Sequence, residues 1–207
     1  MIDIRTLTSD QLTDALHALG QPRFRADQVE QWLWQKDAAT FEEMTNLPKA
    51  LRETLSGHYA IHKARPDVTQ RSSDGTVKIA FRLHDDRLIE GVMIPAGERM
   101  TACVSSQVGC TLACSFCATG QLKRERNLTA GEIVDQVVAL DRAAREAFGT
   151  GLTNIVYMGM GEPLLNYDNV VRSIRWITSP DGLGMSPRRI TVSTVGVARG
   201  ITRLADE

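Results

Sequence analysis

The chain has 207 residues, of which 43% are hydrophobic, 24% charged and 5% aromatic, and 24 basic against 25 acidic side chains give a formal net charge of −1. This composition is typical of a folded globular chain with room for one sizeable domain or two smaller ones. The near-neutral charge gives no argument for nucleic-acid binding, and no apolar run approaches the roughly 18 residues of a membrane-spanning helix. The sequence starts without the basic-then-apolar pattern of a signal peptide, so we expect a cytoplasmic protein without membrane attachment.

Residues 1–60 carry helical patterns and are expected to form a small helical domain. Apolar side chains recur at helical spacing after Ser9, between Arg25 and Lys36, and again after Pro48, which suits the first turn of a helix. Trp32 and Trp34 offer surfaces on which nucleic-acid bases could stack, but core packing is the interpretation we favour.

Residues 61–98 change to the alternating pattern of β-strands. Apolar and polar side chains alternate from Val77 to Leu83, with turn-forming residues on both sides. A further strand is expected over Leu88 to Ile94, with Glu90 in its middle. A β-hairpin or meander is therefore predicted for this segment, and the position of Glu90 alone indicates only a solvent-facing side chain.

From residue 99 onward, strand and helix patterns alternate. Strands are expected over residues 101–105, 154–158 and 189–194, each followed by a helical pattern. This order predicts an α/β fold of parallel strands joined by right-handed crossovers. The candidate catalytic and binding residues follow the carboxyl ends of these strands, so we expect them at one rim of the sheet. They are a cysteine loop, the pair Gly161-Glu162, and Ser193.

All four cysteines of the sequence lie within one short stretch. Cys110, Cys114 and Cys117 have the spacing C-x3-C-x2-C, and Cys103 precedes them. Cytosolic cysteines crowded in this way indicate metal ligands or redox chemistry rather than disulfides, although inert buried thiols are an alternative. Structural zinc typically needs four ligands from two knuckles, and Cys103 is a possible fourth. Three thiolates on a four-iron cluster would instead leave one iron open to bind a ligand.

The cysteine spacing, with an aromatic residue before the last cysteine, resembles the radical S-adenosylmethionine (SAM) superfamily. Within it, longer strings resemble the adenine-C2 methyltransferases of 23S ribosomal RNA and transfer RNA, together with their C8-methylating antibiotic-resistance relatives. The resemblance covers nearly the whole chain. The matching strings are residues 24–28, 43–48, 103–110, 117–121, 126–133 and 159–166.

This resemblance implies two cofactors, a 4Fe–4S cluster and SAM. It implies that Cys110, Cys114 and Cys117 ligate the cluster and that the open iron binds the amino and carboxylate groups of SAM. The residues implied to contact SAM are Gly161, Glu162 and Ser193. Without the resemblance, the Gly-Glu-Pro turn would be a plain strand-to-helix connection, and the serine would be a helix cap.

The resemblance also assigns roles in a methyl-cysteine ping-pong mechanism. Cys103 is similar to the family's resolving thiol, which attacks the methyl-carrying cysteine and forms a disulfide with it. Because that attack needs a thiolate, we expect the pKa of Cys103 to be lowered. Glu90 matches the family's proton acceptor, so the resemblance gives it a functional role.

The function implied is methylation of C2 of adenine in 23S rRNA and in tRNA. The implied partners are these two RNAs and an electron donor such as flavodoxin, while the oligomeric state is left open. A C8-methylating relative, or a catalytically incomplete fragment that binds only a metal cluster, are the alternatives. Basic side chains suited to phosphate contacts, or equally to a solvated surface, are Lys123, Arg124, Arg126, Arg188 and Arg189.

The family builds a (βα)6 TIM-like barrel, and residues 99–207 provide three βα units of it. We therefore expect a partial radical SAM barrel, preceded by an RNA-binding-like accessory domain at 1–60 and a β-rich connecting segment at 61–98. In the family the methyl-carrying cysteine lies far downstream, and no cysteine follows Cys117 here. A C-terminally truncated chain is the expectation, with the strand near Ile190 left as an unpaired edge.

Overall fold

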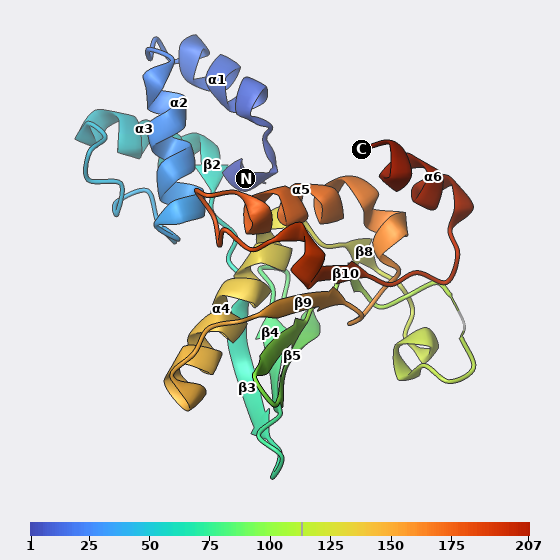
Figure 1. Ribbon diagram of the computed structural model, residues 1–207. Helices are drawn as coiled ribbons and strands as arrows, with labels where there is room; N and C mark the ends of the chain where they lie inside the picture. The colour runs from blue at the N-terminus through green and yellow to red at the C-terminus, as the bar shows by residue number, and fades with distance from the viewer. Residues whose placement is uncertain (113) are drawn as a thin grey trace.

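The computed structural model describes residues 1–112 and 114–207; Ala113, inside the cysteine motif, lies outside the described residues. The main helices are α1 (Ser9–Ala18), α2 (Phe24–Glu30), α3 (Lys49–His58), α4 (Ala130–Phe148), α5 (Tyr167–Thr178) and α6 (Ala198–Asp206). The strands are β1 (Ile2–Asp3), β2 (Tyr59–Ala60), β3 (Arg65–Arg71), β4 (Val77–Arg82), β5 (Leu88–Ala96), β6 (Arg99–Cys103), β7 (Gln107–Val108), β8 (Arg126–Asn127), β9 (Asn154–Tyr157) and β10 (Ile190–Val192). Figure 1 shows the N-terminal helices as one group beside a larger unit built on a sheet.

The N-terminal helices form where the sequence predicts them. Thr8 and Gln11 make a capping box at the start of α1, and each satisfies a backbone amide of the other. The helix expected between Arg25 and Lys36 is α2 followed directly by a π-helical turn, η2 (Gln31–Gln35). These helices share their own core, to which Trp32 and Trp34 add half-buried rings, as the core interpretation predicts. That core is formed by Ile4, Leu12, Leu16, Ala26, Val29, Leu33, Ala38, Phe41, Met44, Leu47, Leu51 and Leu55.

One mixed sheet forms the centre of the larger unit. Its strand order is β10-β9-β6-β5-β4-β3, with the β3–β6 meander antiparallel and β6, β9 and β10 parallel. The α/β class is therefore confirmed. The sheet in the described residues is open rather than a closed barrel. Pairing between β5 and β6 makes the predicted meander and the predicted parallel strands one continuous sheet, which the sequence patterns did not indicate.

Helices cover one face of this sheet. The inward-facing side chains of β4, β5 and β6 pack against α4, and Phe81, Ile89, Met93 and Leu140 are fully buried there. The alternation of the strands sends the intervening side chains, among them Glu90, to the opposite face. Function therefore has to be sought on that opposite face and at the ends of the strands.

Buried polar contacts join the N-terminal helices to the larger unit. Arg5 is 1% exposed, and its guanidinium bonds Asp135 of α4 at 2.8 Å and also contacts Asp3. Arg172 of α5 donates to the backbone carbonyls of Thr6, at 3.1 Å, and Leu7. The two parts are thus held together by specific bonds rather than by apolar packing alone.

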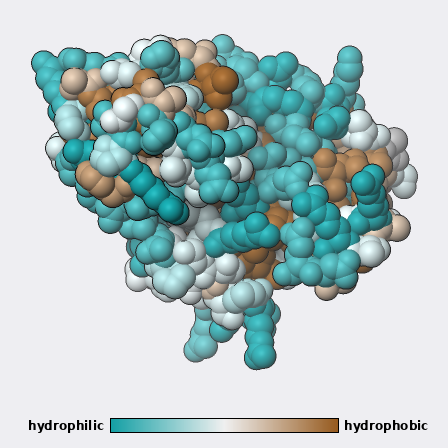
Figure 2. Space-filling view, turned by 90° about the horizontal axis from the view of Figure 1, so that it is seen from above, coloured by the Kyte–Doolittle hydropathy of each residue, from teal (hydrophilic) through white to brown (hydrophobic). Residues whose placement is uncertain are grey.

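No helix within residues 1–112 and 114–207 is long and apolar enough to cross a bilayer. Figure 2 shows a mainly hydrophilic face with separate apolar groups. Exposed apolar side chains on and near α6 are Leu165, Val195, Ile201 and Leu204.

Candidate functional site

The parallel strands bring the predicted residues to one rim. Because β6, β9 and β10 run in the same direction, the loops that follow them emerge at the same edge of the sheet. A cavity of about 680 Å³ lies there. It is lined by Cys110, Cys114 and Cys117, by Gly161 and Glu162, and by Ser193, together with Leu112, Phe116, Tyr157 and Met158 and their neighbours. Residues predicted from three separate segments therefore share one cavity.

Pairing of β7 with β8 holds together the two ends of the cysteine loop, residues 109–125. This loop projects beyond the sheet (Figure 1). Inside the loop, the Cys117 amide donates to the Cys114 carbonyl at 3.1 Å, which turns the chain between these two cysteines. The Leu112 amide donates to Cys110 Sγ at 3.4 Å. Hydrogen bonds to ligand sulfurs are one means by which proteins tune iron–sulfur clusters. All three cysteines are free and half-buried.

The donor set of this loop fits a cluster better than a single ion. Zinc needs four donors within about 2.0–2.3 Å of one point. Cys110, Cys114 and Cys117 supply three thiols, and the fourth cysteine, Cys103, is not among the residues that line the same cavity. The three thiols instead border a shared cavity large enough for a bulkier group together with a small molecule.

Glu162 is buried and tied to two loops. Its side chain is 3% exposed, and its two carboxylate oxygens accept from the amides of Leu164 and Val195, both at 3.0 Å. The preceding Gly161 has φ +97°, and a Cβ there would lie 2.5 Å from the side chain of Gln107. Only glycine lets this loop pass so close to the segment that follows β6.

Polar side chains that sequence reasoning missed hold these loops in place. The Gln107 side chain accepts from the Glu162 amide at 2.9 Å and donates to Asn127 at 2.8 Å. Asn166 donates to the carbonyls of Ser106 and Leu128 at 2.7 and 2.8 Å. Gln107 and Asn166 lie inside the strings that carried the family resemblance, which was the one available signal, because their own residue types suggest only loops.

Ser193 lines the cavity directly after β10. Helix α6 begins after Val197 and has no side-chain cap. The neighbouring Thr194 Oγ1 accepts from the amides of Gly196 and Val197 at 3.1 and 3.3 Å, in the turn before that helix. The plain interpretation of Ser193 as a helix cap is therefore wrong, and the serine stays beside the cavity.

Cys103 and Glu90 are not among the residues that line this cavity, and both lie on the opposite face of the sheet from α4. Cys103 pairs in register with Val92, and Glu90 lies two residues from Val92 on the same face. Glu90 is exposed and forms an ion pair with Lys78 at 2.9 Å. Burial raises the pKa of Cys103, against the smaller lowering effect of a hydrogen bond from the Met158 backbone. The expected lowering of this pKa is therefore wrong, because desolvation disfavours the thiolate.

Arg126, one of the basic residues considered for RNA contacts, is already paired with carboxylates. Arg126 binds Glu132 through two bonds of 2.8 Å and Asp85 through one of 2.7 Å. Burial disfavours its charged form, but these partners outweigh burial and raise the pKa of Arg126. A guanidinium held in this way positions the base of the cysteine loop instead of reaching for phosphate.

Comparison with known proteins agrees with this geometry. Residues 104–206 match the radical SAM superfamily, and residues 2–61 match the N-terminal domain of ribosomal RNA large subunit methyltransferases. The cysteine loop and the strand-end cavity therefore define a radical SAM domain. The predicted cofactors, a 4Fe–4S cluster and SAM, are confirmed at the level of this superfamily.

Individual relatives extend the similarity over the whole chain. A probable dual-specificity RNA methyltransferase RlmN of Flavobacterium psychrophilum is 56% identical over 205 residues, which are 99% of this chain and 59% of the relative. The corresponding protein of Nitratidesulfovibrio vulgaris strain DP4 is 47% identical and is also covered to 59%. A crystal structure of a radical SAM methyltransferase from Sphaerobacter thermophilus superposes with a TM-score of 0.84 at 46% identity, over all of this chain and 61% of that one.

The chain belongs to the RlmN family of dual-specificity RNA methyltransferases, as the sequence resemblance predicts. It spans about 59% of the length of the curated relatives that it matches.

Proposed function

We propose that this protein acts as a radical SAM methyltransferase on C2 of adenine in 23S ribosomal RNA and in transfer RNA. The observation that carries the proposal is the shared cavity: three cysteines from one loop, Gly161 and Glu162 from a second and Ser193 from a third border the same space. Identity of 44–56% to RNA methyltransferases along the whole chain supports the substrate class.

Cys110, Cys114 and Cys117 would hold the 4Fe–4S cluster, which, when bound, supplies the electron that cleaves SAM. Such chemistry suits the substrate, because C2 of adenine is not nucleophilic and a polar attack on a methyl donor would fail. The protein then supplies position and electrostatics. The amide of Leu112 on Cys110 Sγ and the turn between Cys114 and Cys117 orient two of the three thiols.

Gly161, Glu162 and Ser193 would bind SAM. Each carboxylate oxygen of Glu162 already accepts one backbone amide, and each has a second lone pair for the ammonium group of the methionine moiety. Gly161 keeps the backbone close to the cavity wall, and the Ser193 hydroxyl adds a neutral donor and acceptor. The two amide bonds hold the Glu162 carboxylate in place before SAM arrives.

Glu90 and Cys103 would act on the RNA-linked intermediate, Glu90 as proton acceptor and Cys103 as resolving thiol. Both side chains lie on the sheet face that the helices leave open. Because burial keeps Cys103 protonated, a base must take its proton before it attacks sulfur. With three cysteines assigned to the cluster and one to this step, the methyl-carrying role falls to none of the four cysteines in the sequence.

The finer architecture belongs to the same proposal. We assign β6, β9 and β10 to the first three strands of a (βα)6 barrel, residues 1–60 to an RNA-binding-like accessory domain and residues 61–98 to a connecting segment. The proposed partners are the two RNAs and a cytoplasmic electron donor of the flavodoxin kind. The exposed edge of β10 is where a further barrel strand would pair.

Anaerobic reconstitution with iron and sulfide tests the proposal. We expect about four irons per chain, a reducible cluster signal in electron paramagnetic resonance, and reductive cleavage of SAM to 5′-deoxyadenosine. Alanine at Cys110, Cys114 or Cys117 should abolish all three, whereas Cys103→Ala should leave them intact. Bound zinc without SAM cleavage would refute the proposal that the protein is a radical SAM enzyme. Because none of the four cysteines is left for the methyl-carrying role, we expect this chain alone to leave an RNA transcript unmethylated. Analysis of any modified adenosine that does form separates C2 from C8 products.

A further inference from the structure

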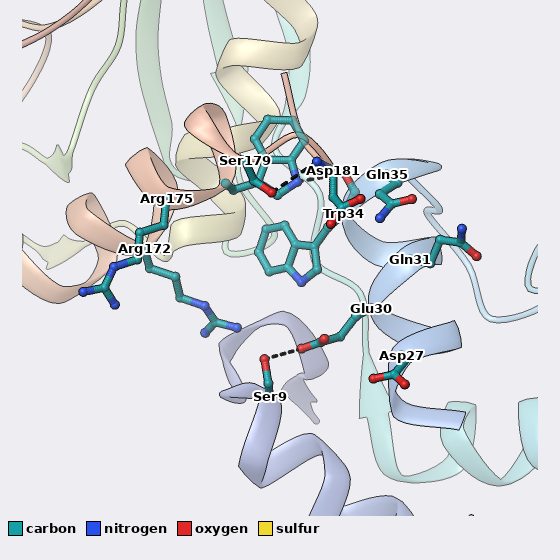
Figure 3. Close-up of a pocket in the computed structure, with 11 residues that line it drawn as sticks. Ser9, Asp27, Glu30, Gln31, Trp34, Gln35, Arg172, Arg175, Ser179 and Asp181 are labelled. Carbon is teal, nitrogen blue, oxygen red and sulfur yellow. Dashed lines mark hydrogen bonds between the residues drawn. The ribbon is translucent and has the colours of Figure 1, made fainter. Parts of the chain in front are cut away.

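A second cavity, of about 450 Å³, lies between the N-terminal helices and α5 (Figure 3). Its volume falls within the range of small-molecule sites, about 300–1,000 Å³. The residues that set its chemistry are Glu30, Trp34, Arg172, Arg175, Trp176 and Asp181. None of them lines the cavity proposed to bind SAM.

Contacts between the two parts of the chain shape this cavity. Trp34 belongs to the π-helical turn η2, a type of turn that occurs frequently at functional sites. The Trp176 indole donates to the Trp34 carbonyl at 2.9 Å, and the Arg172 guanidinium lies 5.5 Å from the Trp34 ring. Figure 3 shows the Trp34 indole in the middle of the labelled side chains. Two residues of α5 thus hold Trp34, one at its backbone carbonyl and one over its ring.

The charges around Trp34 are mixed. Glu30 uses one carboxylate oxygen to accept from the Ser9 hydroxyl at 2.6 Å, and its other oxygen is not needed for that bond. Arg175 is 73% exposed and lies 3.4 Å from the Glu207 carboxylate. Asp27 of α2 and Asp181 from the segment after α5 add two further carboxylates. The two arginines disfavour a cationic side chain, and the carboxylates disfavour a bare polyanion.

A nucleotide can contact the indole, the carboxylates and the guanidinium groups of this cavity at the same time. A base can stack on an indole whatever its sequence, carboxylates accept from amino and imino groups on its edge, and a guanidinium suits its phosphate. We propose that this cavity binds one unstacked nucleotide of the RNA substrate, with the base on Trp34, its edge toward Glu30 and Asp181, and its phosphate at Arg175. The RNA identity of the ligand rests on the proposed function.

The position of the cavity fits this role. α5 begins one short 3-10 turn after Glu162, with Arg172 at its middle and Arg175 and Trp176 in its second half. Twelve helical residues span about 18 Å. An RNA held at both cavities would therefore run along α5 and be anchored a few nucleotides away from the reacting adenine.

The test measures binding of nucleoside monophosphates and of a labelled single-stranded oligoribonucleotide by equilibrium dialysis and anisotropy. Trp34→Ala should weaken oligonucleotide binding by about tenfold, the effect of losing one stacked base. Trp32→Ala is the matched control, because Trp32 lies on the same turn but bonds Asn46 and faces Lys36 outside the cavity. Equal weakening by both variants would overturn the proposal, as would no weakening by either.

A charge variant keeps the proposal falsifiable if Trp34→Ala fails to fold. Arg175→Glu should weaken binding and lower the salt slope by about one, as expected for one lost phosphate contact. Arg71→Glu, the same charge change at the exposed end of β3, should leave both unchanged. RNA that contains 4-thiouridine should crosslink to residues 27–35 or 172–181. Crosslinks found only elsewhere would contradict the assignment.

Failure of this proposal and failure of the proposed function give different results. SAM cleavage by the reconstituted protein, measured on the same preparations, does not involve this cavity. Intact SAM cleavage with RNA binding unaffected by Trp34→Ala would overturn the nucleotide site alone. Absent cleavage with Trp34-dependent RNA binding would overturn the enzyme proposal alone.

Discussion

Glu162 accepts a hydrogen bond from the backbone amide of Val195 at 3.0 Å, so that a carboxylate placed after β9 holds the loop that follows β10. Its other oxygen accepts from the Leu164 amide at the same distance. These bonds fix the wall of the cavity that the three cysteines share. Glu162 therefore stabilises the cavity wall in addition to its proposed contact with SAM.

Replacing this carboxylate should affect both stability and SAM binding. In Glu162→Gln, an NH₂ group faces one of the two backbone amides, so one bond is lost and a buried donor is left unpaired. We expect unfolding free energy in urea to fall by about 1–3 kcal/mol and SAM affinity to fall at least about tenfold. Glu98→Gln, in the exposed β5–β6 turn, is the control. A Glu162→Gln protein as stable as the parent would contradict this account.

Two glycines with positive φ allow the cost of backbone strain to be measured separately from the cost of a steric clash. Gly161 (φ +97°) has no room for a Cβ beside Gln107, whereas Gly97 (φ +59°) has nothing within 4 Å of that position. Alanine at Gly97 should lower the unfolding free energy by about 1–2 kcal/mol, the strain of a left-handed residue. Alanine at Gly161 should lower it by about 1–3 kcal/mol more, because Gln107 must move. Equal losses in urea unfolding would exclude the steric contribution.

Burial of Cys103 predicts slow alkylation at neutral pH. In a protein with alanine at Cys110, Cys114 and Cys117, Cys103 is the one remaining thiol. Its iodoacetamide reaction should rise with pH with a midpoint above the ordinary thiol value of about 8.5, because desolvation raises its pKa. The same protein unfolded in urea should return to the ordinary value. A midpoint below that value in the folded protein would mean that Cys103 is an activated thiol.

The elements of this fold were predictable because their signals are local. Thr8 and Thr129 each open a helix through a capping box with a partner three residues on. The alternation from Val77 to Leu83 identifies β4. Parallel strands then bring their carboxyl ends together by topology alone, which is why Glu162 and Ser193 could be placed on the rim of the cysteine cavity before any distance was known.

What escaped prediction depends on partners far apart in sequence. Arg126 looked like a phosphate ligand because nothing in its neighbourhood reveals that Asp85 approaches it across 41 positions. The pKa of Cys103 depends on burial by neighbouring strands. An expectation based on the mechanism alone does not include that burial. The ion pair of Arg5 with Asp135 spans 130 positions, so neither residue signals the junction that it forms.

The pairing of Asp85 with Arg126 predicts how the stability of the protein changes in acid. Burial alone would raise its pKa, but the hydrogen bond and charge of Arg126 lower the pKa of Asp85 to about 2. In the unfolded chain an aspartate has a pKa of about 3.9, so the unfolded state takes up the proton first as pH falls. The carboxylate therefore contributes up to about 2 kcal/mol above about pH 5, and this contribution is lost between about pH 5 and pH 2.

Asp85→Asn removes that contribution, so its unfolding free energy in urea should lie about 1–2 kcal/mol below the parent at pH 7 and converge with the parent near pH 2. The neighbouring Asp86 is exposed and has φ +62°, a conformation that asparagine adopts readily. Asp86→Asn should therefore follow the parent at every pH. A constant difference between Asp85→Asn and the parent from pH 7 to pH 2 would show that Arg126 does not stabilise the ionised carboxyl.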